Sequence, residues 1–351
     1  MKDTVRTPWR HIISTIILVI IVLISGCSAN RQRAIDNDQV GPQDKLILRF
    51  SYVTGEETPK GLAARKLKEL IEERSHGKIE VQLFPNATLY SDEEEFEELK
   101  KGDVQLIAPA ISKLSSEVPE VQIYDLPYLF PSQEEVWKLS DGPVGQELNR
   151  LLEEKGYKVL SIWDNALKQI TNNDRPIKTP MDFSGLTFRI MPSDLIEQQF
   201  AAVDAKTATL PFSELYTALE KGRVDGEENT VSNIVNKKLY VSQKYITKSD
   251  HGYLGYYVLT DSRFWDSIPA ETQRLITDTL IDVTKWERIQ AQRINQKEYE
   301  ELKANKDIYL YELSSNEKKK WQQAFQGTYG WYLSHVSDNK TIQDYFAEIK
   351  H

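Results

Sequence analysis

The sequence is almost without cysteine, and it lacks the short motifs of common enzyme and nucleotide-binding classes. The only cysteine is Cys27, so no intramolecular disulfide can form. Neither a G-x-G-x-x-G nor a G-x-x-x-x-G-K-[ST] loop occurs, and the G-x-S-x-G motif of many hydrolases is also absent. These absences make an enzyme less expected without excluding one.

Metal binding and nucleic-acid binding are disfavoured on similar grounds. The five histidines are scattered without the spacing of a metal site, and no cysteines are available to assist them. The formal net charge is −9, and no basic cluster occurs in the body of the chain. A nucleic-acid-binding protein normally carries such a cluster. We therefore expect no metal, no cofactor and no nucleic-acid partner.

The N-terminus predicts an exported protein with a lipid anchor. Basic residues precede an apolar run at 12–24 that is typical of a secretory signal and too short for a confident membrane span. The run ends in L-I-S-G-C and is similar to a bacterial lipobox, with Cys27 as the lipidated residue; the alternative is a signal anchor with an incidental cysteine. We expect a signal peptide at 1–27, a polar, flexible tether at 28–44, and a soluble domain at 45–351 on the extracytoplasmic face.

The remaining chain predicts an α/β protein with two lobes. Strand patterns at 46–53, 78–84 and 104–110 alternate with helical patterns, and this β-α-β-α-β order implies a parallel sheet. A second such pattern begins near Trp163.

The lobe boundaries follow from these two patterns. We expect a first lobe at about 45–162 and a second at about 163–251 together with the C-terminal segments. The segment 245–261 predicts paired strands, and a strand near 252–268 would cross back to the first lobe. A helical pattern from Pro269 to about Asn305 would be roughly 50 Å long, enough to contact both lobes.

Arg189 is the candidate binding residue with the clearest physical reason. It lies in a predicted strand between apolar residues, and a buried guanidinium is costly without a carboxylate partner. That partner is either a ligand or an internal acid. The internal candidates are Asp182, Asp194 and Glu227.

Three more polar residues lie near the ends of strands, where open α/β sheets bind ligands. Asn229 follows V-D-G in a predicted turn and would either donate to the ligand or cap the helix at 230–236. Lys60 begins a helix after the first strand, and Lys168 follows the strand that ends in Trp163. The alternative for both lysines is a solvated surface position.

Six motifs together resemble the solute-binding proteins of TRAP transporters, the DctP family. They are T-P-K-G at 58–61, W-D-N-A-L-K-Q at 163–169, P-I-K-T-P-M-D-F-S-G-L at 176–186, F-R-I-M-P-S at 188–193, P-F-S-E-L-Y-T-A-L-E-K-G-R-V-D-G-E-E-N at 211–229 and Q-K-Y-I-T-K-S-D-H at 243–251. The resemblance covers about Leu46 to Tyr332. It implies a periplasmic-binding-protein-like fold with two lobes and a long helix that spans both.

The resemblance also implies roles for single residues. The family's near-invariant arginine falls on Arg189, which would clamp a substrate carboxylate, and its V-D-G-x-E-N turn places Asn229 as a second contact. Lys60 and Lys168 would neutralise the far carboxylate of a dicarboxylate. The remaining predicted contacts are Trp163, Phe212 and Ser193, although aromatic residues more often belong to the core.

Two positions depart from the family pattern. Ala166 replaces a usual glycine in the W-D-N motif, which could alter the loop near Lys168. Glu227 precedes Glu228 where glutamine is frequent. An extra charge beside a bound anion would be unfavourable, so we expect it to point away or to pair with a basic residue.

The sequence therefore predicts a non-enzymatic, lipid-anchored solute-binding protein that captures succinate, fumarate or malate and delivers it to a TRAP membrane permease. The alternative is a dicarboxylate-sensing subunit of a membrane histidine-kinase system. Binders of monocarboxylates and sugar acids could share the same arginine, so the motifs do not fix the ligand.

Overall fold

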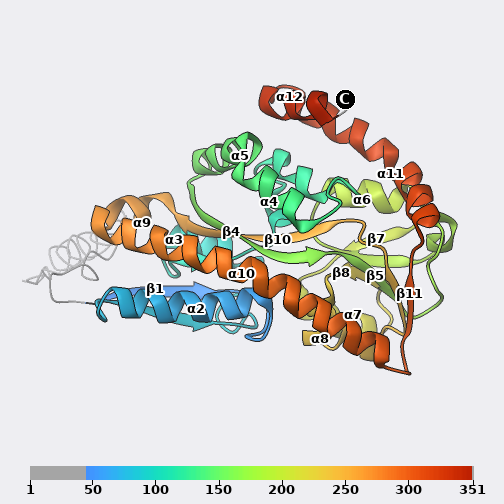
Figure 1. The fold of residues 1–351 in the computed structure, drawn as a ribbon, viewed down its shortest axis with the longest axis horizontal. Coiled ribbons are helices and arrows are strands. Elements are labelled where there is room, and N and C mark those ends of the chain that lie inside the picture. Colours follow the sequence, from blue (N-terminus) through green and yellow to red (C-terminus); the bar gives the residue numbers. More distant parts are fainter. Residues whose placement is uncertain (1–44, 350–351) are drawn as a thin grey trace, which may run out of the picture.

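Two β-sheets with helices packed around them form the protein, as seen in a computed structural model that describes residues 45–349 (Figure 1). One sheet has five strands in the order β2-β1-β3-β10-β4, and the other has six in the order β11-β9-β5-β8-β6-β7. We refer to the elements around them as the first and the second lobe. The predicted signal peptide, the tether and Cys27 lie outside the described residues.

The first sheet begins with the three parallel strands that the sequence predicts. Strand β1 pairs in parallel with β2 and with β3, and helices α2 and α3 follow β1 and β2. Strand β10 then runs antiparallel to both β3 and β4. The bounds are β1 Leu46–Ser51, α2 Pro59–Arg74, β2 Ile79–Phe84, α3 Glu95–Lys101, β3 Leu106–Ile107, η2 Ile111–Leu114, η3 Pro119–Asp125, α4 Gln133–Asp141, α5 Pro143–Glu154, β4 Tyr157–Leu167, β10 Tyr253–Asp261 and α9 Ser262–Ser267.

The second sheet is mixed. Strand β6 pairs in parallel with β7 and β8, whereas β5 runs antiparallel to β8 and β9. The bounds are β5 Gln169–Asn172, η4 Pro180–Phe183, β6 Thr187–Ile190, α6 Asp194–Ala201, β7 Lys206–Thr209, η5 Phe212–Glu214, α7 Leu215–Glu220, β8 Gly226–Asn229, α8 Val231–Asn236, η6 Leu239–Val241, β9 Tyr245–Lys248, β11 Tyr309–Glu312, α11 Ser315–His335 and α12 Lys340–Ile349.

Two local predictions are wrong. The end of the V-D-G-E-E-N segment is not a turn: Gly226–Asn229 form the fully buried strand β8 between β5 and β6. Strands β9 and β10 do not pair with each other, because β9 belongs to the second sheet and β10 to the first. Strand β10 thus returns the chain to the first sheet.

Two of the places where the chain passes from one sheet to the other lie in contact. Lys168 is the single residue between β4 in the first sheet and β5 in the second, and 249–252 join β9 to β10. The backbone N–H of Lys168 donates to the carbonyl of Gly252 at 2.7 Å. A Cβ atom on Gly252 would lie 2.6 Å from Cε of Lys168, so glycine permits the two crossings to approach this closely.

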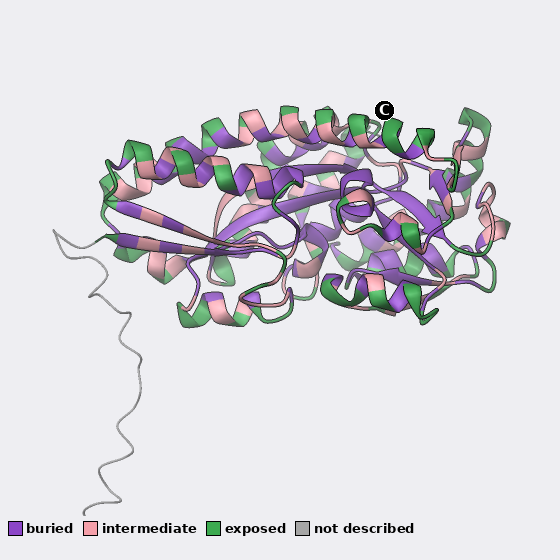
Figure 2. Cartoon of the chain, turned by 90° about the horizontal axis from the view of Figure 1, so that it is seen from below, coloured by how far each residue is buried: buried purple, intermediate pink, exposed green. Residues whose placement is uncertain are grey.

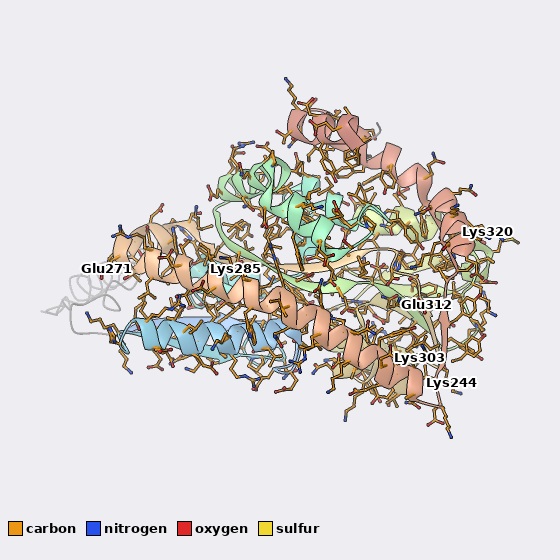
Figure 3. The ribbon with its side chains drawn as sticks, in the orientation of Figure 1. Lys244, Glu271, Lys285, Lys303, Glu312 and Lys320 are labelled. Atoms are coloured by element: carbon orange, nitrogen blue, oxygen red, sulfur yellow. The ribbon has the colours of Figure 1, made fainter. Side chains whose placement is uncertain are left out.

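Helix α10, Ala270–Ala304, spans both lobes as predicted. Its 35 residues pack against α2 and β4 of the first lobe and α8 of the second. Charged side chains such as Glu271, Lys285 and Lys303 extend from it in Figure 3. The interior strands are largely buried, whereas the helices expose one face (Figure 2). Within residues 45–349, no helix is long and apolar enough to cross a membrane.

One carboxylate lies on the buried face of α10. Glu287 is fully buried and accepts a hydrogen bond from the backbone N–H of Asp164 at 2.9 Å, while its other oxygen has no partner. Burial, together with the nearby Asp164 carboxylate, raises the pKa of Glu287 well above its usual value. The folded protein therefore favours a protonated Glu287.

We expect Glu287→Gln to flatten the pH dependence of the unfolding free energy. Because the folded-state pKa of Glu287 is raised, its contribution is most favourable below its unfolded pKa and is lost as the pH rises through the folded pKa. The variant should be more stable than the wild type at pH 8, by an amount on the order of 1 kcal/mol. Urea denaturation at pH 5 and pH 8 measures this difference. Glu271→Gln, at an exposed position of α10, is the control, and an unchanged pH slope in Glu287→Gln contradicts the prediction.

Candidate functional site

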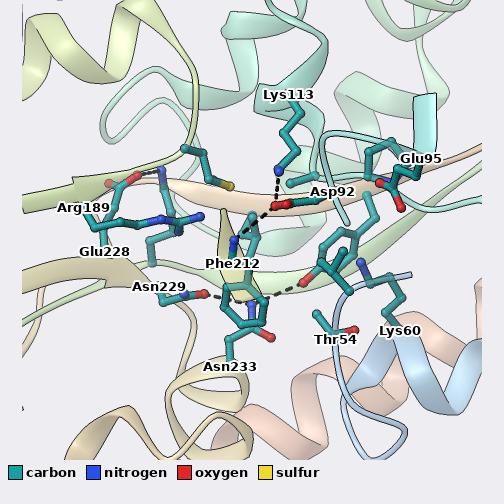
Figure 4. A pocket seen from close by; sticks show the side chains of 17 residues that line it. Thr54, Lys60, Asp92, Glu95, Lys113, Arg189, Phe212, Glu228, Asn229 and Asn233 are labelled. Carbon is teal, nitrogen blue, oxygen red and sulfur yellow. Dashed lines mark hydrogen bonds and ion pairs between the residues drawn. The ribbon is translucent and has the colours of Figure 1, made fainter. Parts of the chain in front are cut away.

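A pocket of about 450 Å³ lies between the two sheets (Figure 4). The first lobe contributes two basic and two acidic side chains, and the second contributes Arg189, Phe212, Glu228 and Asn229. Lys168 reaches the pocket from the crossing between the sheets. The first-lobe charges are Lys60, Asp92, Glu95 and Lys113.

Five of the seven predicted contact residues line this pocket, and Trp163 and Ser193 do not. Trp163 is fully buried in β4 and packs against Phe50, with ring centroids 5.8 Å apart. Ser193 accepts a hydrogen bond from the N–H of Ile196 at the start of α6 and donates to Asp125 of η3 at 2.9 Å. Trp163 is therefore a core residue and Ser193 a helix cap, and both lie behind the residues that line the pocket.

Arg189 presents an unpaired guanidinium to the pocket. It lies in β6 and is only 2% exposed, and its Nε atom donates to the carbonyl of Leu210 at 2.9 Å. Among the described residues, no carboxylate oxygen lies within 4 Å of it, and its two terminal nitrogens make no hydrogen bond that the structure records. Burial lowers the pKa of Arg189, and attraction from Glu227, Asp92 and Glu228 opposes this effect.

The internal partners considered for Arg189 have other roles. Asp182 completes the capping box of η4, and Asp194 is exposed. Glu227 is the neighbour of Arg189 across the β6–β8 pairing, but its oxygens accept hydrogen bonds from Thr171 and Asn229. Burial raises the pKa of Glu227 to about 7. As expected for the extra acid, Glu227 does not line the pocket.

Lys168 forms a buried ion pair with Glu228. The distance from Nζ to Oε1 is 2.5 Å, and both side chains are about 1% exposed. The second oxygen of Glu228 lies 2.9 Å from Nε2 of His251, whose Nδ1 lies 2.8 Å from Oγ of Ser249. Burial acts to raise the pKa of Glu228, but Lys168 and His251 lower it to about 2. The surface alternative for Lys168 is wrong, and its charge is neutralised within the protein.

Asn229 combines both roles considered for it. Its Oδ1 atom accepts from the N–H of Thr230 at 3.1 Å and from the amide of Asn233 at 2.8 Å, which orders the start of α8. Its Nδ2 atom donates to Glu227 at 3.0 Å, and the residue also lines the pocket. The amide therefore retains one N–H for a ligand.

Among the basic residues that line the pocket, Lys60 is the second one without an ion-pair partner. It is 1% exposed, so the surface alternative is wrong here too. Its Nζ atom donates to the carbonyl of Ala108 at 2.8 Å and lies 3.8 Å from the centre of the Tyr256 ring, a cation–π contact. Burial lowers the pKa of Lys60 to about 7, and Glu95 partly offsets this effect.

Sequence reasoning missed four charged residues of the pocket, namely Asp92, Glu95, Lys113 and Glu228. Lys113 forms an ion pair with Asp92, whose carboxylate also accepts from the N–H of Phe212 at 3.2 Å, linking the two lobes. Glu95 is 1% exposed and begins α3 within an acidic run that looks like a solvated helix face. The one available signal is Leu99, four residues later, which is buried on the same side of α3.

The charges leave two cations available to an anion. The pocket is lined by four basic and three acidic side chains. Lys113 pairs with Asp92 and Lys168 with Glu228, so Arg189 and Lys60 remain, one from each lobe. Within residues 45–349, no group of histidine, cysteine and acidic residues is arranged to hold a metal ion.

Comparison with known families agrees with this geometry. Residues 50–334 match the model of the DctP family, described as bacterial extracellular solute-binding protein, family 7. The chain belongs to this family. It is therefore a member of a family of solute-binding transport proteins and not of an enzyme family.

Three similar proteins have ligands in their names. The C4-dicarboxylate-binding protein DctB of Bacillus subtilis is 45% identical over 305 residues, which is 87% of each chain. A TRAP periplasmic solute-binding protein of Shewanella oneidensis with bound succinate is 36% identical with a TM-score of 0.81, covering 83% of this chain and 95% of that one. One from Pseudomonas aeruginosa with bound L-malate is 36% identical with a TM-score of 0.79, covering 81% and 99%.

Removing Lys168 alone should destabilise this DctP-family protein, because Glu228 would remain as a buried charge. We expect Lys168→Met to lower the unfolding free energy by about 3 kcal/mol. Lys168→Met combined with Glu228→Gln should recover most of the loss, as measured by urea denaturation. The control is Lys158→Met in β4, which breaks a surface pair with Glu153 and should cost less than about 1 kcal/mol. A double variant no more stable than Lys168→Met would show that the pair is not the cause.

Proposed function

We propose that this protein binds a C4-dicarboxylate, such as succinate, malate or fumarate, and delivers it to the membrane permease of a TRAP transporter. The 45% identity to a protein named for C4-dicarboxylate binding supports this ligand class, as do the succinate and L-malate in two similar structures. The pocket geometry supports it independently.

The observation that carries the proposal is the unpaired fork of Arg189 opposite the unpaired ammonium of Lys60. Figure 4 shows the two groups on opposite sides of the pocket. A C4-dicarboxylate carries one carboxylate at each end. The terminal nitrogens of Arg189 suit one carboxylate because a guanidinium forms two parallel hydrogen bonds with it. Lys60 supplies a compact positive charge for the other.

The remaining predicted residues take narrower roles in this proposal. Asn229 offers its spare N–H near Arg189, and Phe212 supplies an apolar wall. Lys168 acts through Glu228, because its ammonium is already paired. Its role is thus to position β8 at the crossing and not to bind the far carboxylate.

Closure of the lobes would follow from the placement of Arg189 in the second lobe and Lys60 in the first. One carboxylate is held by the second lobe and the other by the first, so a bound ligand favours the arrangement in which both contacts form. Exclusion of water then strengthens each contact. Asp92 adds a direct link between the lobes through the N–H of Phe212. The permease would recognise the closed form.

We expect Arg189→Ala to weaken succinate binding by about 3 kcal/mol, roughly a hundredfold or more in Kd, because it removes one side of a desolvated charge pair. Isothermal titration calorimetry with succinate and malate measures the loss. Arg189→Lys keeps the positive charge but not the two parallel donors of the guanidinium. Its affinity for succinate should lie between those of the wild type and Arg189→Ala. The control is Arg223→Ala, whose exposed side chain pairs with Glu214. Near-normal binding by Arg189→Ala, or equal binding of pyruvate by the wild type, would contradict the proposal.

We also propose that Cys27 carries a lipid anchor, on the basis of the L-I-S-G-C motif. Cys27→Ser in the full chain should leave the protein soluble after cell fractionation or retained with an uncleaved signal, without the mass increase of a diacylglycerol group. Ser28→Ala is the neighbouring control. Equal membrane association and unchanged mass of both variants relative to the wild type would contradict an anchor at Cys27.

A further inference from the structure

Glu95 is a buried acid that the proposed binding scheme does not yet use. It is the first residue of α3 and is 1% exposed, and neither of its carboxyl oxygens has a hydrogen-bond partner. Its side chain lines the pocket on the side of Lys60, away from Arg189 (Figure 4). A buried carboxyl group with both oxygens unsatisfied costs stability, so its placement requires a reason.

Three charged groups face Glu95 from the surrounding elements. Lys60 of α2 and Lys113 of η2 attract its ionised form, and Asp92 of the preceding loop repels it. None of them lies within 4 Å as an ion-pair partner of Glu95, and Lys113 is already paired with Asp92. Burial raises the pKa of Glu95 to about 7 despite the two lysines. The group therefore changes its charge near neutral pH.

When all four basic groups of the pocket are charged, its formal charge depends on the protonation of Glu95. With every acid ionised, four basic and three acidic side chains give +1. A dicarboxylate with both groups ionised carries −2, so a pocket with a protonated Glu95 matches it and a pocket with an ionised Glu95 does not. A second carboxylate beside an ionised Glu95 would also be repelled in a site shielded from water.

We propose that Glu95 is a specificity-determining residue that binds in its protonated form and donates a hydrogen bond to the far carboxylate of the ligand. The pocket would then bind a dicarboxylate dianion together with a proton at Glu95. This inference rests on the proposed function and adds to it the protonation state of the site. Lys60 and Glu95 together would form the far subsite, one through its charge and the other through its O–H.

Linkage gives the direction of the pH effect. A nearby dianion favours protonated Glu95 and protonated Lys60, so both groups take up protons on binding, and affinity falls as the pH rises through neutrality. Glu227 near Arg189 has a pKa of about 7 as well and would act in the same direction. The part of the proton uptake and of the pH dependence that is due to Glu95 is therefore the part that is lost when Glu95 alone is replaced.

The experiment is calorimetric titration of the folded protein with succinate at pH 6.0, 7.0 and 8.5, in buffers with small and large ionisation enthalpies. We expect the wild type to take up protons at pH 8.5 and its Kd to rise by about tenfold or more between pH 6.0 and 8.5. Glu95→Gln imitates the protonated acid and keeps an N–H donor. On binding succinate, this variant should take up fewer protons than the wild type, by at most one. It should also bind succinate more tightly than the wild type at pH 8.5.

Two further variants separate the charge from the hydrogen bond. Glu95→Met is similar in length but has no donor, and it should bind succinate about tenfold more weakly than Glu95→Gln at every pH. Glu97→Gln, an exposed position of the same helix, should match the wild type in Kd and proton uptake. Thermal unfolding of each variant confirms that it is folded.

The outcomes distinguish this inference from the proposed function. If the wild type binds succinate but Glu95→Gln shows the same proton uptake and the same pH dependence, the role of Glu95 is overturned and dicarboxylate binding stands. Equal binding by Glu95→Met and Glu95→Gln overturns the hydrogen bond. If the wild type binds no C4-dicarboxylate at any of the three pH values, the proposed function itself fails.

Discussion

The ion pair between Lys168 and Glu228 is the contact on which the arrangement of the pocket depends. Lys168 alone separates β4 of the first sheet from β5 of the second, and its side chain is buried there. Glu228 of β8 neutralises it, and His251 from the second crossing binds the other oxygen of the same carboxylate. One carboxylate therefore joins both crossings to the second sheet. A buried pair of this kind contributes little net stability compared with apolar packing, but it fixes the geometry because neither partner can be left alone.

Because Glu228 neutralises Lys168 and Asp92 neutralises Lys113, Arg189 and Lys60 are the two basic groups of the pocket without an ion pair. Burial lowers the pKa of both, which means that the fold disfavours their charged forms. Perturbed groups of this kind gather at functional sites, where a ligand supplies the missing interaction. Because Arg189 belongs to the second lobe and Lys60 to the first, an anion that satisfies both must contact both lobes. The same unbalanced charges thus relate ligand binding to lobe closure.

The parts of this structure that are predictable from sequence rest on local signals. Helix α10 follows from apolar residues at helical spacing. Arg189 is predictable because a strand arginine between apolar residues needs a partner. Strand β8 is not predictable, since Gly226–Asn229 contain no apolar side chain and their burial comes from the pocket and from neighbouring strands. Glu95 and Lys113 are not predictable as pocket residues either. Each has the sequence pattern of a surface residue, and only the tertiary structure brings it to the pocket.

The proposed roles of Arg189, Lys60 and Glu95 also give a physical basis for discrimination among organic acids. A monocarboxylate can occupy Arg189 but leaves Lys60 and Glu95 facing each other, so the far subsite gains nothing from binding. A dianion engages both ends, and it does so best when Glu95 carries a proton. Specificity is a difference between these two binding free energies, and unsatisfied buried groups penalise the wrong ligand more than added contacts favour the right one. The carboxyl group of Glu95 has no hydrogen-bond partner, which is unfavourable for the fold on its own. The second carboxylate of the ligand would supply that partner, and it would therefore contribute to the binding free energy.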